Sequence, residues 1–210
     1  LIGGRVIPAF TVVAIHGRGE KAKQTPQEKL DVMAFLSLAL IILVLMFIGQ
    51  EGAILAVTAF ISALIHAIRM RRYHTRRILG DPMILILHVG YGWVIVGLLL
   101  LGVTALNILP FSISLHAFTV GAIGSMTLGM MCRLALAHTG RNLNATKLTV
   151  LIFALLQCAA FMRVFGLVIA PDITEQWLIG SAMLWALCFF LYILIYVPIL
   201  WKPDLDERVA

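Results

Sequence analysis

The chain has 210 residues, of which 61% are hydrophobic and only 12% are charged. Its mean hydropathy of +1.02 lies far above that of a water-soluble domain, so the composition excludes a soluble enzyme. The formal net charge of +6 resembles that of nucleic-acid-binding proteins, but most of the sixteen basic residues lie in alternate loops. A chain of this kind is divided into membrane spans of about 20 residues, and about six of them fit.

The first ten residues, LIGGRVIPAF, have no initiator methionine and no basic segment followed by a cleavage site, so they are not a signal peptide. We interpret residues 1–15 as the end of an upstream transmembrane helix and residues 16–29 as a cytoplasmic loop. The sequence therefore predicts that the chain is the C-terminal part of a longer membrane protein.

Six apolar segments follow, each long enough to cross a bilayer as a helix. They lack the alternation of barrel strands, and backbone groups in hydrocarbon must be satisfied within their own segment. The expected fold class is all-α, a polytopic helical membrane protein with a six-helix bundle over residues 30–200 and a cytoplasmic tail at 201–210. Asp81 and Pro82 begin the third span as an N-cap and first helical residue. The predicted spans are Leu30 to Ile48, Gly52 to Ile68, Met83 to Leu106, Leu115 to Ala137, Leu148 to Ala170, and Trp177 to Leu200.

Lysine and arginine occur in every other connection between the spans. Residues 16–29 contain four, residues 69–81 five, residues 138–147 two and the tail two, whereas the three intervening turns contain none. By the positive-inside rule, the C-terminus and the RMRRYHTRR loop are predicted to be cytoplasmic. This pattern explains the positive charge without nucleic acid, although the RMRRYHTRR run could alternatively bind RNA or anionic lipid headgroups.

Ionisable side chains inside the spans are candidates for function, because a charge in hydrocarbon costs several kcal/mol unless it faces a cavity or a partner. His88 follows Pro82 by six residues, which places it about 9 Å from the start of its helix. Thr58, Ser62 and His66 recur every four residues and share one face of the second span. The candidates fall at two depths: His66, His88, Arg133 and His138 towards the cytoplasm, and His116 with Arg163 towards the outside.

The inner level has the groups that a haem between helices requires: an imidazole ligand, apolar walls, close backbone approach and a cation for the propionates. Close approach is available at Gly90 and Gly92 beside His88, and Arg133 supplies the cation. A copper ion would accept imidazole together with thioether or thiolate sulfur. Such sulfur atoms lie on the fourth span, at Met126, Met130, Met131 and Cys132.

Each of these features also has an alternative that involves no ligand. A histidine near a helix end is often a hydrogen-bonding residue at the membrane interface, and methionines commonly fill gaps between helices. Gly121, Ser125 and Gly129 recur every four residues, a pattern that is typical of close helix packing. Arg163 either snorkels to the surface or pairs with a propionate or with an acidic residue from an upstream part. Spacing alone leaves these alternatives open.

Four strings in the chain resemble the NnrS family. They are GGRVIPAFT at residues 3–11, LHVGYGW at 87–93, HAFTVGAIGSMTLGMMCRLALAHTGR at 116–141, and the aromatic pattern from Trp177 to Pro198. The long third string is the most specific of them. The resemblance covers essentially the whole chain, and because family members have around twelve spans, it implies that this chain is the C-terminal half.

The resemblance implies a protein of the bacterial inner membrane that contains haem b and copper and takes part in the response to nitric oxide and nitrosative stress, as in denitrifying bacteria. It leaves open whether the protein is an enzyme. The implied partners are the missing N-terminal half, the lipid bilayer and nitric oxide, without nucleic acid. The implied cofactor-binding residues are Arg5, His88, Tyr91, His116, Arg133, His138 and Arg141, and the implied metal ligands are His88, His116, His138 and Met130.

Two other classes of function are compatible with the sequence. A secondary transporter or channel without a metal cofactor would have paired breaks near the middle of its spans, and charged groups at that depth. Near the middle of a span this chain has only Gln157, with Arg163 beyond it. A structural subunit would use its helices to pack a partner, which the histidines and arginines inside the spans do not favour. His66 and His74 lie in a segment that is less typical of the family.

Overall fold

The computed structural model describes residues 2–202, and every regular element in that range is helical. Six helical stretches are long and apolar enough to cross a membrane, which confirms the predicted polytopic all-α fold. Of the tail predicted at 201–210, Trp201 ends the last helix and residues 203–210 lie outside the described residues. In chain order the elements are η1 Ile2–Val6, α1 Ile7–Gly17, α2 Glu28–Phe47, α3 Ala53–Met70, η2 Thr75–Arg77, α4 Pro82–Ala105, α5 Phe111–His116, η3 Ala117–Ile123, α6 Gly124–Ala137, α7 Lys147–Ile169, η4 Pro171–Ile173 and α8 Thr174–Trp201.

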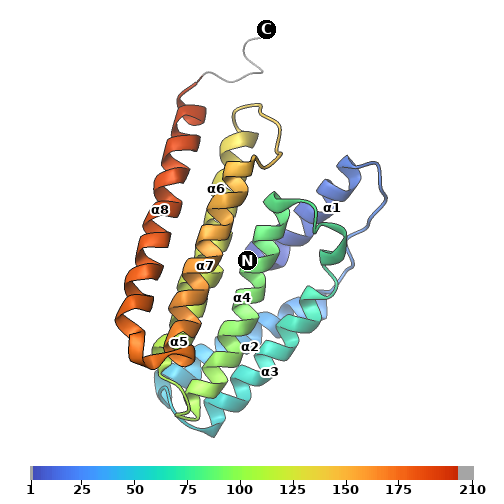
Figure 1. Cartoon of the computed structure of the whole chain (residues 1–210). Helices are drawn as coiled ribbons and strands as arrows, with labels where there is room; N and C mark the ends of the chain where they lie inside the picture. Colours follow the sequence, from blue (N-terminus) through green and yellow to red (C-terminus); the bar gives the residue numbers. More distant parts are fainter. Residues whose placement is uncertain (1, 203–210) are drawn as a thin grey trace.

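Helix α4 is the central element of the bundle (Figure 1). It packs against α1, α3 and α6, while α7 and α8 lie side by side as a pair and α2 lies on the outer side of α3. The connections at 18–27, 71–81 and 138–146 lie at one end, which we call the basic end. Those at 48–52, 106–110 and 170–173 lie at the other, which we call the acidic end. The cytoplasmic location of the basic end stays a prediction.

The helix ends follow from local sequence. The Asp81 side chain accepts a hydrogen bond from the Ile84 amide at 3.3 Å, and Pro82 is the first residue of α4, as the sequence predicted. Thr146 caps α7 in the same way, since its hydroxyl oxygen accepts from the Thr149 amide at 3.2 Å. Both caps satisfy amides that a helix cannot pair within itself.

The fourth span departs from the continuous helix that the sequence predicts over Leu115–Ala137. It begins earlier, at Phe111, and contains the π-helical segment η3 between α5 and α6. A second π-helical segment, η1, precedes α1. π-Helical turns are rare and frequently occur at functional sites. Hydropathy patterns cannot distinguish them from α-helix, because both keep the same residues in the apolar layer.

The small residues of the fourth span serve helix packing. A Cβ atom at Gly121 would come within 2.5 Å of the Trp93 ring on α4, and one at Gly129 within 2.6 Å of Ile86. A Cβ atom at Gly90 would likewise lie 2.8 Å from Met126. The structure therefore supports the packing interpretation of these glycines, because side chains of the neighbouring helix already fill the space beside them.

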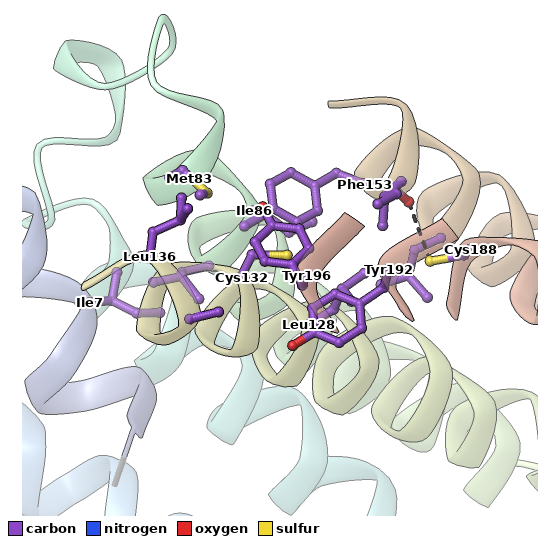
Figure 2. Close-up of a cluster of buried hydrophobic side chains, with 14 of the residues drawn as sticks. Ile7, Met83, Ile86, Leu128, Cys132, Leu136, Phe153, Cys188, Tyr192 and Tyr196 are labelled. Carbon is purple, nitrogen blue, oxygen red and sulfur yellow. Dashed lines mark hydrogen bonds between the residues drawn. The ribbon is translucent and has the colours of Figure 1, made fainter. Parts of the chain in front are cut away.

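The main hydrophobic core lies between α4, α6, α7 and α8 (Figure 2). Tyr192 and Tyr196 of α8 stack with ring centroids 4.9 Å apart and pack against buried Cys132 and Leu128 of α6. The Tyr196 hydroxyl lies 3.0 Å from the Thr149 hydroxyl. Outward-facing side chains are also apolar along α2 and α8, where they would face lipid.

We expect Gly121→Ala to lower the free energy of unfolding by about 1–3 kcal/mol, because the added methyl group overlaps the Trp93 ring. Gly92→Ala is the matched control, since a Cβ atom there would meet nothing within 4 Å. Replacing a helical glycine at an open position stabilises by up to about 1 kcal/mol. Thermal unfolding in detergent checks both variants, and equal melting temperatures would contradict the packing role of Gly121.

Candidate functional site

A group of polar side chains is buried at the basic end, where α1, α2, α3, α4 and the 71–81 loop meet. We call it the polar cluster. Its members come from five separate segments of the chain, so only the tertiary fold brings them together. They are Thr11, Asp31, His66, Arg69, Tyr73, Thr75, His88 and Tyr91.

His88 is completely buried, and threonine hydroxyls hold both of its ring nitrogens. Its Nε2 lies 2.9 Å from Thr11 Oγ1, and its Nδ1 lies 2.9 Å from Thr75 Oγ1. The Thr11 hydroxyl already donates its only hydrogen to the Ile7 carbonyl at 2.7 Å. It must therefore accept from His88 Nε2, and when the ring is neutral its Nδ1 accepts from Thr75.

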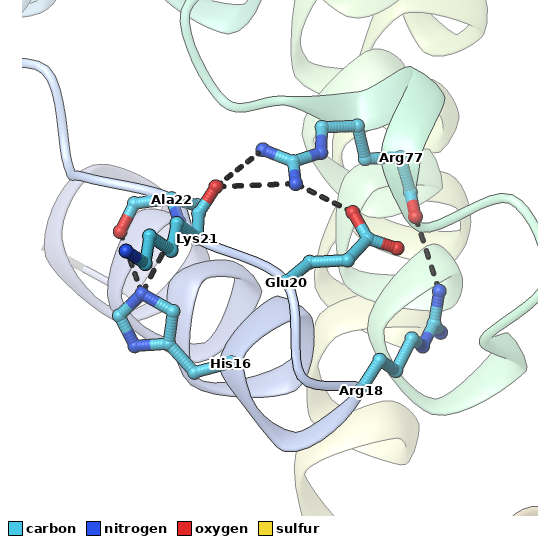
Figure 3. Close-up of polar contacts among 6 residues, drawn as sticks. All are labelled: His16, Arg18, Glu20, Lys21, Ala22 and Arg77. Atoms are coloured by element: carbon cyan, nitrogen blue, oxygen red, sulfur yellow. Dashed lines mark hydrogen bonds and ion pairs between the residues drawn. The ribbon is translucent and has the colours of Figure 1, made fainter.

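Contacts between two loops, several of which are drawn in Figure 3, hold the turn that contains Thr75 in place. Arg77 donates to the Lys21 carbonyl at 3.2 Å and pairs with Glu20 at 2.5 Å. Arg18 donates to the Arg77 carbonyl at 3.1 Å and pairs with Asp81 at 3.3 Å. These contacts fasten the segment after α1 onto the turn that contains Thr75 and on which His88 Nδ1 depends.

Arg69 organises the other half of the cluster. Its Nε and Nη2 each lie 2.7 Å from Asp31 Oδ1, and its Nη1 donates to the Tyr91 hydroxyl at 3.2 Å. The same hydroxyl lies 2.7 Å from His66 Nδ1. A chain of hydrogen bonds therefore leads from the partly exposed Asp31 carboxylate to a buried imidazole. A side chain at Gly4 would overlap the guanidinium of Arg69 and would have to displace it.

Two buried polar atoms of the cluster, His66 Nε2 and the Tyr73 hydroxyl, have no hydrogen-bond partner among the described residues. The Tyr73 ring packs edge-on against His88, with centroids 6.2 Å apart. Burial raises the pKa of Tyr73 above its ordinary value.

An apolar cleft of about 310 Å³ opens beside the cluster, along α4. His88 and Thr75 are the polar side chains in its wall, and the remaining surface is hydrocarbon and aromatic. Its size is at the lower end of small-molecule sites. The apolar and aromatic lining residues are Met70, Leu85, Val89, Trp93 and Val96.

Arg133 of α6 is the second buried cation at this end. Only 7% of the residue is exposed, and its guanidinium carbon lies 4.5 Å above the ring of Phe10 on α1. Among residues 2–202 no carboxylate pairs with it. A cation–π contact compensates a buried charge only in part, so this group retains the capacity to bind an anion.

The structure brings together some of the residues that the sequence singled out and separates others. His88 and Tyr91 belong to the polar cluster. His138 is exposed at the C-terminus of α6, and Arg5 is exposed in η1. Arg141 is partly exposed and donates to the Thr139 carbonyl at 3.2 Å. The other two lie elsewhere: Met130 packs at the edge of the main core, and His116 lies at the acidic end.

The positions of two basic residues correct the sequence interpretation. Arg69 was counted as a loop residue, but it lies in the last turn of α3 and is 91% buried, because Asp31 balances its charge. His66 belongs to the cluster although its segment is less typical of the family. The sequence carries one signal for this: His66 precedes Arg69 by three residues, and residues with that spacing are neighbours on one face of a helix. The sequence reasoning missed Thr11, Asp31, Tyr73 and Thr75, whose role depends on contacts between distant segments.

Within residues 2–202, no group of three or more histidine, cysteine, aspartate or glutamate side chains is close enough to hold a metal ion. Cys132 is buried in the main hydrophobic core, where Met126, Met130 and Met131 pack against the same cluster of side chains.

Comparison with known proteins yields one family. The model of the family described as NnrS protein matches residues 1–204. No curated protein and no solved structure matches the chain.

Two tyrosines of the cluster should respond oppositely to loss of the hydroxyl. Tyr91→Phe removes the partner of both His66 and Arg69, so we expect it to lower the free energy of unfolding by about 1–3 kcal/mol. Tyr73→Phe removes a buried hydroxyl without a partner and should leave stability unchanged or raised at pH 7.

The advantage of Tyr73→Phe should increase above about pH 10. In that range the unfolded chain loses the phenol proton while the folded protein keeps it, so stability of the wild type falls as pH rises. Thermal unfolding of both tyrosine variants at pH 7 and at about pH 10.5, roughly half a unit above the ordinary tyrosine pKa, checks this. Equal destabilisation by the two substitutions at pH 7 would contradict the assigned contacts.

Asp31→Asn should lower the free energy of unfolding by about 1–3 kcal/mol, because it leaves the buried Arg69 guanidinium without a carboxylate. Glu28→Gln makes the same change of charge in the same first turn of α2, where the side chain is exposed, and should change stability by less than about 0.5 kcal/mol. Thermal unfolding measures both. If Glu28→Gln proved the more harmful, a general effect of the helix terminus would replace the ion pair as the explanation.

Proposed function

The chain belongs to the NnrS family, and on that premise we propose that it is a haem-binding membrane protein that takes part in the bacterial response to nitric oxide and nitrosative stress. The observation that carries the proposal is the buried imidazole of His88 in the wall of an apolar cleft. The proposed location is the inner membrane, with the basic end and the C-terminus in the cytoplasm.

The residues at the basic end include the chemical groups that a haem needs, namely an imidazole nitrogen, apolar walls and a cation for its carboxylates. His88 would supply the nitrogen, and the cleft supplies apolar walls. Arg133 is a buried cation at the same end that no described carboxylate neutralises, although it does not line the cleft. When bound, the haem iron would supply the centre to which nitric oxide binds.

Thr11 and Thr75 prepare His88 for this role. The Thr11 hydroxyl accepts from Nε2, which fixes the ring orientation and leaves the lone pair on Nδ1. A hydrogen bond of this kind is the usual support of a ligating histidine. The Thr75 hydroxyl covers Nδ1 and lines the same cleft. Rotation of the Thr75 side chain would therefore present the lone pair to the cleft without moving helix α4.

The rest of the cluster holds this arrangement without adding net charge. Asp31 and Arg69 neutralise each other, and Tyr91 links the pair to His66. Tyr73 packs between the rings of His88 and Tyr91 and excludes water from them. A dry, apolar cleft of this kind is accessible to a small gas such as nitric oxide.

The described residues offer no cluster of copper ligands built on histidine, cysteine, aspartate and glutamate. They contain no group of three or more such side chains, and His138 is exposed at the C-terminus of α6. Copper would need further ligands from the N-terminal half that the family resemblance implies as a partner. We therefore assign no role to copper in the cleft.

The test is the haem content of the purified protein and of histidine variants. His88→Gly should lose haem by about tenfold or more relative to protein, and imidazole added to the buffer should restore part of it by occupying the vacated space. His74→Gly is the control, because this histidine lies in the loop at the basic end, outside the cleft wall, and its ring makes a hydrogen bond with the Lys23 carbonyl at 3.1 Å.

Full haem content in His88→Gly would contradict His88 as the ligand. The same measurement on His66→Gly then identifies the alternative imidazole, whose Nε2 has no partner among the described residues. Size-exclusion chromatography of each variant separates loss of haem from loss of folding.

A further inference from the structure

A second cavity lies at the acidic end, between the fourth span, α7 and α8. Its volume is about 370 Å³, and its wall includes His116, Arg163, Ser181 and Trp185. The sequence placed His116 and Arg163 at the same depth, and the structure brings them into one cavity. We propose that this cavity binds an oxyanion group that also carries a hydroxyl, with Arg163 as its counter-charge and His116 as its hydrogen-bond acceptor.

The positive charge of Arg163 is expected to bind an anion. It lies six residues before Ile169, the last residue of α7, so its backbone is about 9 Å below the helix end. Among residues 2–202 no carboxylate forms an ion pair with it, and no acidic residue lines the cavity. A guanidinium at this depth is costly unless an anion pairs with it, and its planar donors match phosphate and carboxylate.

His116 provides a hydrogen-bond acceptor, in contrast to the donors of Arg163. Its Nδ1 makes a short hydrogen bond to the Ser112 carbonyl, and because a carbonyl oxygen only accepts, Nδ1 carries the hydrogen. The lone pair therefore lies on Nε2, which can accept from a hydroxyl of a ligand. The hydroxyls of Thr119 and Ser181 already donate to the Leu115 and Leu178 carbonyls, each at 2.9 Å. The cavity thus combines one strong cationic donor with one acceptor.

The shape of the cavity comes from η3 and from small side chains. The π-helical segment begins directly after His116 and places Thr119 and Val120 in the wall. Ala159 and Ala182 leave room on α7 and α8. The resulting volume exceeds that of a bare ion and falls within the range of small-molecule sites.

Two sources supply this chemistry: a glycerol phosphate headgroup of the surrounding lipid, and free hydrogen phosphate from the aqueous phase. Both offer a phosphate anion next to a hydroxyl group. The site lies at the opposite end of the bundle from His88 and does not depend on the haem proposal. It also gives His116 a partner other than a metal ion, since no other metal-binding side chain lines the cavity.

The binding test uses intact-protein mass spectrometry of the purified protein with phosphatidylglycerol, and with phosphatidylcholine as the lipid of no net charge. We expect one phosphatidylglycerol per chain with a preference of about tenfold or more, and Arg163→Gln should abolish that preference. Arg163→Lys should keep part of it. Arg72→Gln removes the same charge from an exposed loop position and should retain the preference.

Two further measurements separate the sources and the role of the cavity. Ala182→Leu keeps the charge but reduces the space, so it should weaken binding by about fivefold or more if the headgroup enters the cavity. Displacement of the lipid by millimolar inorganic phosphate would identify the aqueous anion as the ligand, and persistence of the lipid would identify the headgroup. The proposal would be overturned if a folded Arg163→Gln variant bound phosphatidylglycerol as well as the wild type does and if neither protein preferred it to phosphatidylcholine.

Discussion

The ion pair between Arg69 and Asp31 is the interaction on which the basic end of the molecule depends. A guanidinium this deeply buried is tolerated only with a counter-charge, and Asp31 on the neighbouring helix supplies it. Because the pair fixes the guanidinium, its remaining donor points at Tyr91, and Tyr91 in turn holds His66. Gly4 leaves the space that the guanidinium occupies. The ion pair thus aligns α1, α2, α3 and α4 around one buried site.

The three arginines inside the spans are accommodated in different ways. Arg69 has a carboxylate, Arg133 has the face of an aromatic ring, and Arg163 has a cavity. Of the three positive charges, only that of Arg69 is fully compensated by described residues. The other two retain the capacity to bind anions, one near the imidazole cluster at the basic end and one at the acidic end. The two positions differ in chemistry, since Arg133 lies against an aromatic ring at the basic end and Arg163 lines a cavity at the acidic end.

The sequence predicted the number and limits of the spans well, because hydrocarbon requires long apolar helices and Asp81 and Pro82 mark a helix start. It did not predict the π-helical segment after His116, which leaves hydropathy unchanged. The candidate site was predicted in part. His88 was found from its place inside a span and Tyr91 through the family resemblance, whereas Thr11, Asp31 and Thr75 join them only through tertiary contacts. The predicted span ended with the apolar run at Ile68, which left Arg69 outside its helix.

The central claim is that the apolar cleft at His88 is a preformed cofactor site. The most direct test is a reduced-minus-oxidised optical spectrum of the purified protein from haem-sufficient cells, recorded with and without nitric oxide. We predict a b-type spectrum that shifts when nitric oxide is added. A folded but colourless preparation would contradict the claim. The buried histidines would then be structural residues, and a transporter or channel function would become the leading hypothesis.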